Sequence, residues 1–229
     1  MRSTLLASLG LAGCASDEPA DDPVFPPDSQ PYGRTYSQWA VSFVQWTLGQ
    51  PADRHLGTDT ASCADVNTGD VWFVTGRIAG DGPVVRSCTI PSNVAIVAPV
   101  ITTTCTKLEG VGNTEAELRE CAKLDEDAVS LAEATLDGEP IENVDQYRVA
   151  TELFGFTLPD NNVMEQLWGV ENAPAGTYDA QAVADGRWLI FKPLPKGEHT
   201  LYLHGVIPEG TSAPFGAFET DVTYHFTVE

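Results

Sequence analysis

Runs of β-branched and aromatic residues recur from about residue 70 to the end of the chain, and turn-forming residues separate them. Runs of this length and composition, bounded by Gly, Pro, Asn or Asp, are typical of β-strands. The sequence predicts turns at Asp185-Gly186 and Lys196-Gly197, and a hairpin closed by Asp137-Gly138. The predicted strands are 71–77, 84–90, 94–101, 146–151, 154–158, 187–192, 199–206 and 221–228, together with the hairpin segment 129–141.

Two segments follow the period of a helix instead. The first, 35–48, carries aromatic residues spaced three and four apart, which therefore share one helical face. These residues are Tyr36, Trp39, Phe43 and Trp46. The second, 114–127, begins with a capping box of Thr114 and Glu117. We interpret the aromatic face as one that packs on a sheet, with a ligand platform as the alternative, because so much aromatic area requires burial.

About nine short strands and two helices predict an all-β fold, mainly an antiparallel β-sandwich of Ig-like or jelly-roll-like type, with two flanking α-helices. No linker-like stretch interrupts residues 32–229, so we expect a single domain there. The preceding residues 14–31 are acidic, rich in Pro and poor in large apolar groups. This composition predicts a disordered tether.

The N-terminal sequence MRSTLLASLGLAGC combines one Arg, a short apolar stretch and small residues directly before Cys14. The apolar stretch is too short to span a bilayer as a helix. Its end, Leu-Ala-Gly-Cys, resembles the lipobox of bacterial lipoproteins. The resemblance implies that residues 1–13 are a signal peptide and that Cys14 carries a lipid anchored in the outer membrane. An ordinary secretory signal peptide is the alternative.

Five cysteines are present, and lipidation of Cys14 would leave four for two disulfides in an oxidising compartment. Four cysteines allow three connectivities. We favour Cys63–Cys88 and Cys105–Cys121, because both pairs close local segments. A zinc site is the alternative, but the chain lacks the C-x-x-C pair and the Cys–His spacing that such sites use.

The chain has 33 Asp and Glu residues against 12 Lys and Arg, which gives a formal net charge of −21 at pH 7. So few cations cannot form the basic face that nucleic acid or an anionic membrane surface requires. The acidic excess favours divalent cations instead. Asp65, Asn67 and Asp70 offer side-chain oxygens in a segment that partly resembles an EF-hand loop. Ca²⁺ is therefore the cofactor that the sequence suggests, with plain Asx turns as the alternative.

His204 and His225 fall on the outward-facing positions of two predicted strands. If these strands pair, the two imidazoles and a nearby carboxylate would suit a transition metal; two unrelated surface histidines are the alternative. His199 shares a face with leucines, and we expect it to be half-buried and bonded to a backbone carbonyl. The signatures G-x-S-x-G, S-x-x-K, H-E-x-x-H and the P-loop are absent from the sequence, and no catalytic residue is predicted.

Aromatic surface is the remaining candidate chemistry, since exposed Trp and Tyr rings on a β-sandwich can bind sugar. Trp168 lies in a long segment without a strand pattern, and Tyr178 ends that segment. These two are the candidate ligand-binding residues. Trp188 and Tyr224 share strand faces with aliphatic residues, so we expect them in the core.

Several segments carry a resemblance over most of residues 32–229. They are YSQW (36–39), QW (45–46), GDVWFVTG (69–76), RSCTIP (86–91), APVI (98–101), TEAELREC (114–121), LDGEPIENVDQYRV (136–149) and DGRWLIFKPLPKGEHTLYLHG (185–205). In this order they resemble an uncharacterised family of exported bacterial proteins, from which the chain departs at 95–97 and at Thr102. The resemblance implies a secreted β-rich domain with paired cysteines, and it carries over no activity and no catalytic residue.

The sequence supports two hypotheses about function. In the first, the protein is a lipid-anchored β-sandwich of the cell envelope and acts as a non-catalytic binding or structural module for a glycan or an envelope partner. In the second, it is a secreted hydrolase or a metal-dependent enzyme on the same scaffold, using His199 or the His204 and His225 pair. The sequence leaves the ligand and the oligomeric state open.

Overall fold

The computed structural model describes residues 22–58, 62–78, 80 and 82–229. The strands are β1 (Val71–Phe73), β2 (Val84–Ile90), β3 (Ala95–Thr106), β4 (Leu131–Leu136), β5 (Glu139–Pro140), β6 (Arg148–Ala150), β7 (Phe154–Leu158), β8 (Gly176–Phe191), β9 (Gly197–Ile207) and β10 (Phe218–Val228). The helices are α1 (Tyr36–Leu48), α2 (Cys63–Val66), α3 (Glu115–Asp127) and α4 (Val163–Gln166), with a 3₁₀ turn, η4, at Lys107–Glu109.

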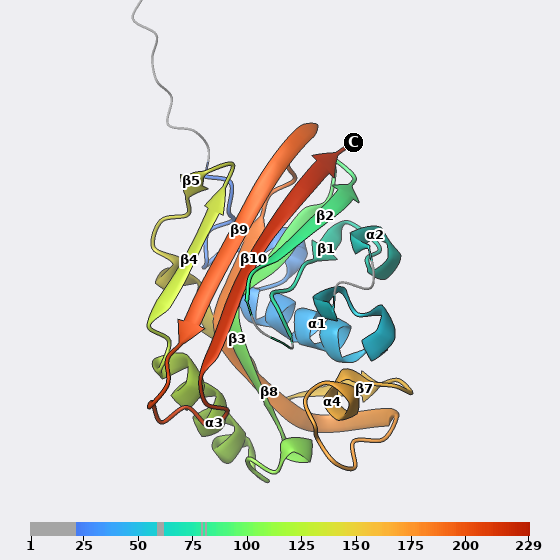
Figure 1. The fold of residues 1–229 in the computed structure, drawn as a ribbon, viewed down its shortest axis with the longest axis vertical. Coiled ribbons are helices and arrows are strands. Elements are labelled where there is room, and N and C mark those ends of the chain that lie inside the picture. The colour runs from blue at the N-terminus through green and yellow to red at the C-terminus, as the bar shows by residue number, and fades with distance from the viewer. Residues whose placement is uncertain (1–21, 59–61, 79, 81) are drawn as a thin grey trace, which may run out of the picture.

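Two five-stranded sheets form the centre of the molecule (Figure 1). The first has the order β1-β3-β8-β6, with β7 also paired to β8, and the second has the order β2-β10-β9-β4-β5. The predicted β-rich fold with few helices is therefore confirmed, and the arrangement is consistent with a β-sandwich. The sheets are mixed, however, because β1 runs parallel to β3 and β2 runs parallel to β10.

The inner face of the second sheet follows the alternation of the sequence. Leu201 and Leu203 on β9 and Val222, Tyr224 and Phe226 on β10 are all buried, as the pattern predicts. Burial of these side chains removes a large apolar area from water and holds the sheets together. The sheets approach closely at one point, where a Cβ atom on Gly205 would stand 2.6 Å from the Cβ atom of Ile101 on β3.

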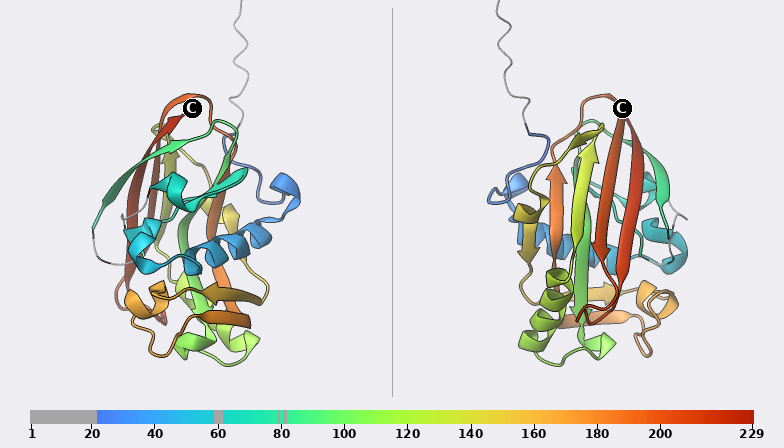
Figure 2. Two further views of the ribbon diagram at one scale, coloured as in Figure 1. Left: turned by 90° about the vertical axis from the view of Figure 1, so that its right-hand side faces the viewer. Right: turned by 60° about the vertical axis from the view of Figure 1, so that its left-hand side comes forward.

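Both predicted helices are confirmed; Thr114 caps the second as expected, and Thr35 caps the first. The aromatic face of α1 packs on the first sheet, where the ring centroids of Phe43 and Trp188 are 5.2 Å apart and those of Trp46 and Phe73 are 5.5 Å apart. Figure 2 shows α1 crossing the strands of this sheet. The aromatic face is thus largely a packing surface, as we interpreted it.

The predicted turn at Asp185-Gly186 is wrong, because both residues lie within the 16-residue strand β8. Two tertiary contacts outweigh the local turn preference. The Asp185 carboxylate accepts hydrogen bonds from Arg148 on β6, at 2.8 and 3.1 Å. Gly186 is needed for space, since a Cβ atom there would stand 2.6 Å from the Cβ atom of Thr102. The sequence marked only 187–192 as strand because Ala, Asp and Gly have low β-propensity.

Part of the predicted tether belongs to the folded domain. Val24 is fully buried and pairs with Phe191 at the end of β8. Lys192 donates its backbone N–H to the carbonyl of Pro23, and Phe25 donates to Ile190. Residues 23–25 therefore belong to the folded domain, which starts before the predicted residue 32. The predicted signal peptide, Cys14 and the first part of the tether lie outside the described residues.

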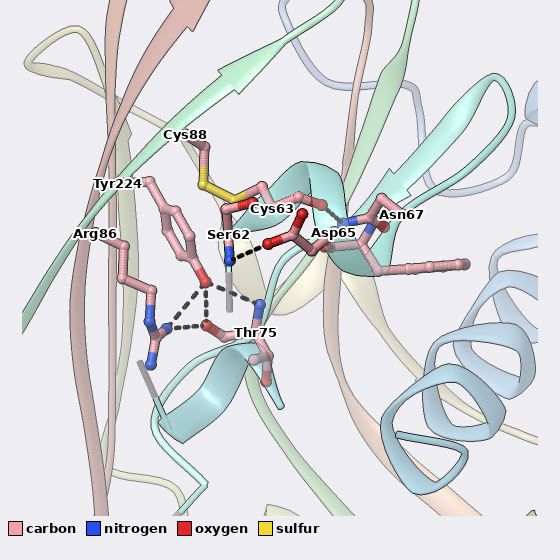
Figure 3. Close-up of a disulfide and its surroundings, with 9 residues drawn as sticks. Ser62, Cys63, Asp65, Asn67, Thr75, Arg86, Cys88 and Tyr224 are labelled. Atoms are coloured by element: carbon pink, nitrogen blue, oxygen red, sulfur yellow. Dashed lines mark hydrogen bonds between the residues drawn. A yellow bond between two sulfur atoms is a disulfide. The ribbon is translucent and has the colours of Figure 1, made fainter. Parts of the chain in front are cut away.

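Both favoured disulfides are confirmed. Cys63–Cys88 joins α2 to β2 (Figure 3), and Cys105–Cys121 joins β3 to α3. Within the described part of the chain, the helices are too short or too polar to cross a bilayer.

Candidate ligand-binding cavity

A cavity of about 690 Å³ lies beside β3. It is bounded by the C-terminal half of α1, by residues 99–104 of β3 and by η4. The segments 75–78, 168–171 and 215–218 add to its wall, together with Asp125 of α3, Ile207 of β9 and Thr220 of β10. The volume falls within the range of small-molecule sites, about 300–1,000 Å³.

The cavity exists because β1 leaves β3 early. The two strands pair only from Val71 to Phe73, and one more bond joins the Val74 N–H to the Val97 carbonyl. Beyond Val74 the chain turns to the second sheet, where Arg77 donates its backbone N–H to the hydroxyl of Thr220. A space is therefore left along the edge of β3 that β1 would otherwise cover.

A buried polar cluster holds the departing chain in place (Figure 3). The Nη1 atom of Arg86 donates to the Thr75 carbonyl at 2.7 Å and to the Tyr224 hydroxyl at 2.9 Å. The Tyr224 hydroxyl donates in turn to the Thr75 carbonyl at 2.7 Å and accepts from the Thr75 N–H. Because Thr75 is buried, these bonds satisfy its backbone and fix the path of the cavity wall.

Most of the cavity wall is apolar. Phe43, Val44 and Leu48 of α1 form one side. Ile78, Val100 and Ile101 contribute further aliphatic surface. Val100 lies at a register shift between Pro99 and Ile101, and such bulges redirect side chains next to functional sites.

Three carboxyl groups interrupt this apolar wall, those of the exposed Glu171, the half-buried Glu109 and the buried Asp125. Glu109 accepts two hydrogen bonds from Thr106, at 2.7 Å from the backbone N–H and 2.8 Å from the hydroxyl. Burial raises the pKa of Glu109 to about 7; the Thr106 bonds oppose the rise, and the charge of Asp125 adds to it. Burial likewise raises the pKa of Asp125, against hydrogen bonds from Phe215 and Thr103. The cavity thus combines apolar surface with acidic groups that protonate more readily than usual.

Trp168 lines this cavity, whereas Tyr178 does not. The indole of Trp168 is half-buried and donates from Nε1 to the carbonyl of Ile78 at 3.1 Å. Tyr178 stacks on Phe156 with ring centroids 5.3 Å apart and donates its hydroxyl to the Pro174 carbonyl. Of the two aromatic candidates, the structure therefore brings only Trp168 to the cavity.

The residues predicted to bind Ca²⁺ have structural contacts of their own. Asp65 accepts from the N–H of Ser62 in the capping box of α2. The buried Asn67 side chain bonds the backbone of Cys63 and Phe73. Asp70 is exposed beside them. Across the described residues, no group of three or more His, Cys, Asp or Glu side chains is arranged to hold a metal ion.

The strand register corrects the expected metal pair. His204 lies opposite Asp221, and His225 lies opposite Thr200. The histidines share the outer face, as predicted, but four residues of strand separate them, which corresponds to about 13 Å. The His204 ring instead contacts Glu219 at 2.8 Å and Glu133 at 3.3 Å. One ion cannot bridge two imidazoles so far apart.

The other histidines also lie away from the cavity. His199 contacts the carbonyl of Pro195 at 2.9 Å, as expected, and the carboxylate of Asp137 at 2.7 Å. His55 is fully buried, with Nδ1 accepting from the Gly57 N–H and Nε2 facing the Thr47 carbonyl. None of the four histidines is among the residues that line the cavity.

Sequence reasoning missed Glu109 and Asp125. Each is one of 33 acidic residues, and neither stands in a recognisable motif. The available signal was indirect: these two acids stand next to the partly apolar segments 105–108 and 118–124. Only the packing of α3 and η4 against β3 brings the two carboxyl groups to one cavity.

Comparison with known proteins adds no ligand or activity. No protein-family model matches the chain, and no significant match was found among curated proteins or solved structures. The resemblance to exported bacterial proteins stays a prediction. The cavity is therefore interpreted from its own residues.

Proposed function

We propose that this protein is a non-catalytic binding module, built on a two-sheet scaffold of Ig-like or jelly-roll-like kind, and that its ligand occupies the cavity beside β3. The observation that carries the proposal is a mostly apolar cavity of about 690 Å³ whose wall includes the carboxyl groups of the half-buried Glu109 and the buried Asp125. Pockets that are mostly apolar, with a few polar groups that orient the ligand, are typical binding sites.

The wall also indicates what kind of ligand fits. Aliphatic and aromatic side chains cover most of it, so apolar groups of a ligand gain from burial there. The acidic pair favours a ligand that also carries a hydrogen-bond donor or a positive charge. Trp168 contributes its ring to the wall, but its Nε1–H already donates to the Ile78 carbonyl, so it is not left to bond a sugar hydroxyl. We therefore favour a partly apolar envelope ligand over a glycan.

Binding of Nile red, a neutral apolar dye, tests the proposal. Val170 lines the cavity, and Val170→Trp fills part of it. We expect saturable dye fluorescence that weakens at least tenfold in this variant. Val85→Trp is the matched control, since Val85 is 66% exposed on β2, outside the cavity. Equal dye binding by both variants and the wild type would contradict the proposal.

Export and anchoring form a second part of the proposal. Two disulfides support an oxidising compartment, in which such bonds form and persist. Lipidation at Cys14 would place the domain at the outer membrane. Labelling with radioactive palmitate in a Gram-negative host tests this, and we expect the label and the membrane fraction to be lost in Cys14→Ala. Wild-type protein that takes up no label would contradict the proposed lipid anchor, but it would not affect the proposal of a ligand in the cavity.

A hydrolase is the second candidate function, and Glu109 is the observation that favours it. A pKa of about 7 suits a general acid at neutral pH, and Asp125 supplies a second carboxyl group in the same cavity. The test is release of 4-methylumbelliferone from a panel of glycosides and acyl esters. Turnover that disappears in Glu109→Gln supports this candidate, and no turnover on any member argues against it.

A further inference from the structure

The edge of β3 that faces the cavity is open. On one side β3 pairs with β8 from Ile96 to Thr106. On the other side β1 pairs with residues 95–97 only. Within the described residues, no strand pairs with this side of β3 beyond Val97. An open edge presents a row of backbone donors and acceptors, which is a template for another strand.

The pairing of β8 shows which backbone groups face that edge. On its β6 side, β8 accepts from the Thr151 N–H at the carbonyl of Ala184. Since successive residues of a strand alternate their hydrogen-bonding direction, Asp185 is turned toward β3, where it opposes Thr103. The backbones of Thr102 and Thr104, one residue to either side, then point away from β8. Both residues line the cavity, so their N–H and C=O groups face the ligand space.

We propose that the cavity binds an extended peptide segment of a partner protein, which adds to the open edge of β3 as a further strand. This inference rests on the proposed binding function and names its ligand class. The cavity borders β3 from Pro99 to Thr104, about 17 Å of strand or about five peptide residues. Strand addition takes affinity from backbone hydrogen bonds and specificity from pockets for alternate side chains.

The charged groups of the cavity wall indicate which side chains the peptide should carry. The Thr103 hydroxyl donates to Asp125 at 3.3 Å, and Thr106 donates to Glu109, so both carboxyl groups lie toward the C-terminal end of the open edge. A Lys or Arg side chain of the peptide would find complementary charge there. The apolar part of the wall, away from Arg77 and Glu171, accepts apolar side chains. The segment is thus expected to combine aliphatic residues with one basic residue.

The cavity is already shaped for such a guest. Arg86 and Tyr224 fix residues 75–76 away from β3, so no strand has to be displaced before a peptide enters. A site formed in advance loses less conformational entropy on binding. Phe215 and Phe218 line the cavity with 46% and 38% of their surface exposed. Their rings would be covered by a bound segment.

A positional-scanning library of acetylated, amidated pentapeptides tests the proposal with the full purified protein, using fluorescence polarisation. We expect binding from sublibraries that contain Lys or Arg among aliphatic residues, and at least tenfold weaker binding when Glu replaces the basic residue. The best binder is then N-methylated at residues 1, 3 and 5, or at residues 2 and 4. One of these sets loses at least tenfold in affinity, because its N–H groups face β3, and the other stays within about threefold.

Hydrogen exchange supplies a readout that needs no variant. We expect the amides of Thr102 and Thr104 to exchange at least tenfold more slowly with the peptide bound, while those of Ile101 and Thr103, already in the ladder with β8, change little. No binding from any sublibrary, or equal losses from both methylation sets, overturns the inference. If Nile red still binds and is lost in Val170→Trp, the binding function survives that failure; if Nile red also fails, both are overturned.

Discussion

Arg187 on β8 donates a hydrogen bond from Nη1 to the carboxylate of Glu126 on α3 at 2.8 Å, and the Glu126 side chain is fully buried. The same guanidinium reaches Asp145 from Nε at 2.7 Å. Glu126 follows Asp125 on α3, and consecutive helical residues point about 100° apart. The ion pair therefore holds α3 against β8 while Asp125 faces the cavity. One wall of the candidate site depends on this contact.

Removing one partner of this pair should destabilise the fold strongly. Glu126→Ala leaves the buried Arg187 guanidinium with only the exposed Asp145 carboxylate, and breaking a buried ion pair costs about 3–5 kcal/mol. Urea unfolding at pH 7 measures the loss. Glu152→Ala is the control, because the Glu152 side chain is 94% exposed and 3.6 Å from Arg119, and such surface pairs contribute about 0–1 kcal/mol. Equal effects of the two variants would contradict the assigned role.

The disulfide between β3 and α3 should stabilise the fold independently of this ion pair. Cys105 and Cys121 are separated by 16 residues, and closing a loop of this size in the unfolded chain stabilises the fold by about 3 kcal/mol. We expect the double variant Cys105→Ala, Cys121→Ala to lose about this much in urea unfolding under non-reducing conditions. Iodoacetamide should leave all four domain cysteines of the native, unreduced wild type unlabelled. Labelling at any of them would contradict the pairing.

Features of the fold that depend on residues close together in the sequence could be predicted. Features that depend on contacts between residues far apart in the sequence could not. The capping box of α3 joins two residues only three apart in the sequence, Thr114 and Glu117, and its prediction is confirmed. The disulfides close short segments, and they are confirmed as well. The length of β8 was missed, because residues 176–186 become strand through pairing with β7 and β3 rather than through their own propensity.

Most of the candidate site could not be predicted from the sequence, for the same reason. Its wall joins α1, β3, α3 and three further segments, and it depends on where β1 leaves the sheet. Trp168 was found because an aromatic residue in a segment without pattern is conspicuous. Glu109 and Asp125 were not, since only burial distinguishes them from other acids. His204 and His225 were candidate metal ligands because the chain has few histidines. The pairing of β9 with β10, however, places the two residues too far apart for one ion.

Acidification should destabilise the protein through His55. Burial lowers the pKa of His55 to about 4, against a hydrogen bond with Thr47 that raises it. The unfolded chain binds the proton near pH 6.5, so stability is full above that pH and declines as the pH falls toward 4, by up to about 3 kcal/mol. His55→Gln keeps one donor and one acceptor but does not titrate. Urea unfolding at pH 7 and 4.5 should show a smaller difference in this variant; an unchanged difference would refute the assignment.

Glu109 should have the opposite effect and make the protein less stable as the pH rises. Its pKa is raised to about 7 in the fold, so the protonated form is favoured there. The stability that this group contributes is present below about pH 4.5 and is lost as the pH rises through 7, by up to about 3 kcal/mol. Glu109→Gln removes the titration. We expect this variant to be more stable than the wild type at pH 8 and similar to it at pH 4.5, as measured by urea unfolding. A variant less stable at pH 8 would contradict this.

Even the smallest substitution of Gly205 on β9, by alanine, should destabilise the fold. A Cβ atom there would stand 2.6 Å from the Cβ atom of Ile101 and 3.1 Å from the carbonyl oxygen of Val100. Neither atom belongs to the flexible end of a side chain, so the sheets themselves must separate, at a cost of about 1–3 kcal/mol.

The expected result of Gly205→Ala is a lower urea midpoint, with Val206→Ala on the outer face of β9 as the control that stays within about 1 kcal/mol. Because Val100 and Ile101 also line the cavity, separation of the sheets should shift β3 at the ligand space. Nile red affinity should therefore change in Gly205→Ala and not in Val206→Ala. A Gly205→Ala protein with unchanged stability would show that the two sheets do not meet at Ile101 as closely as the structure has them.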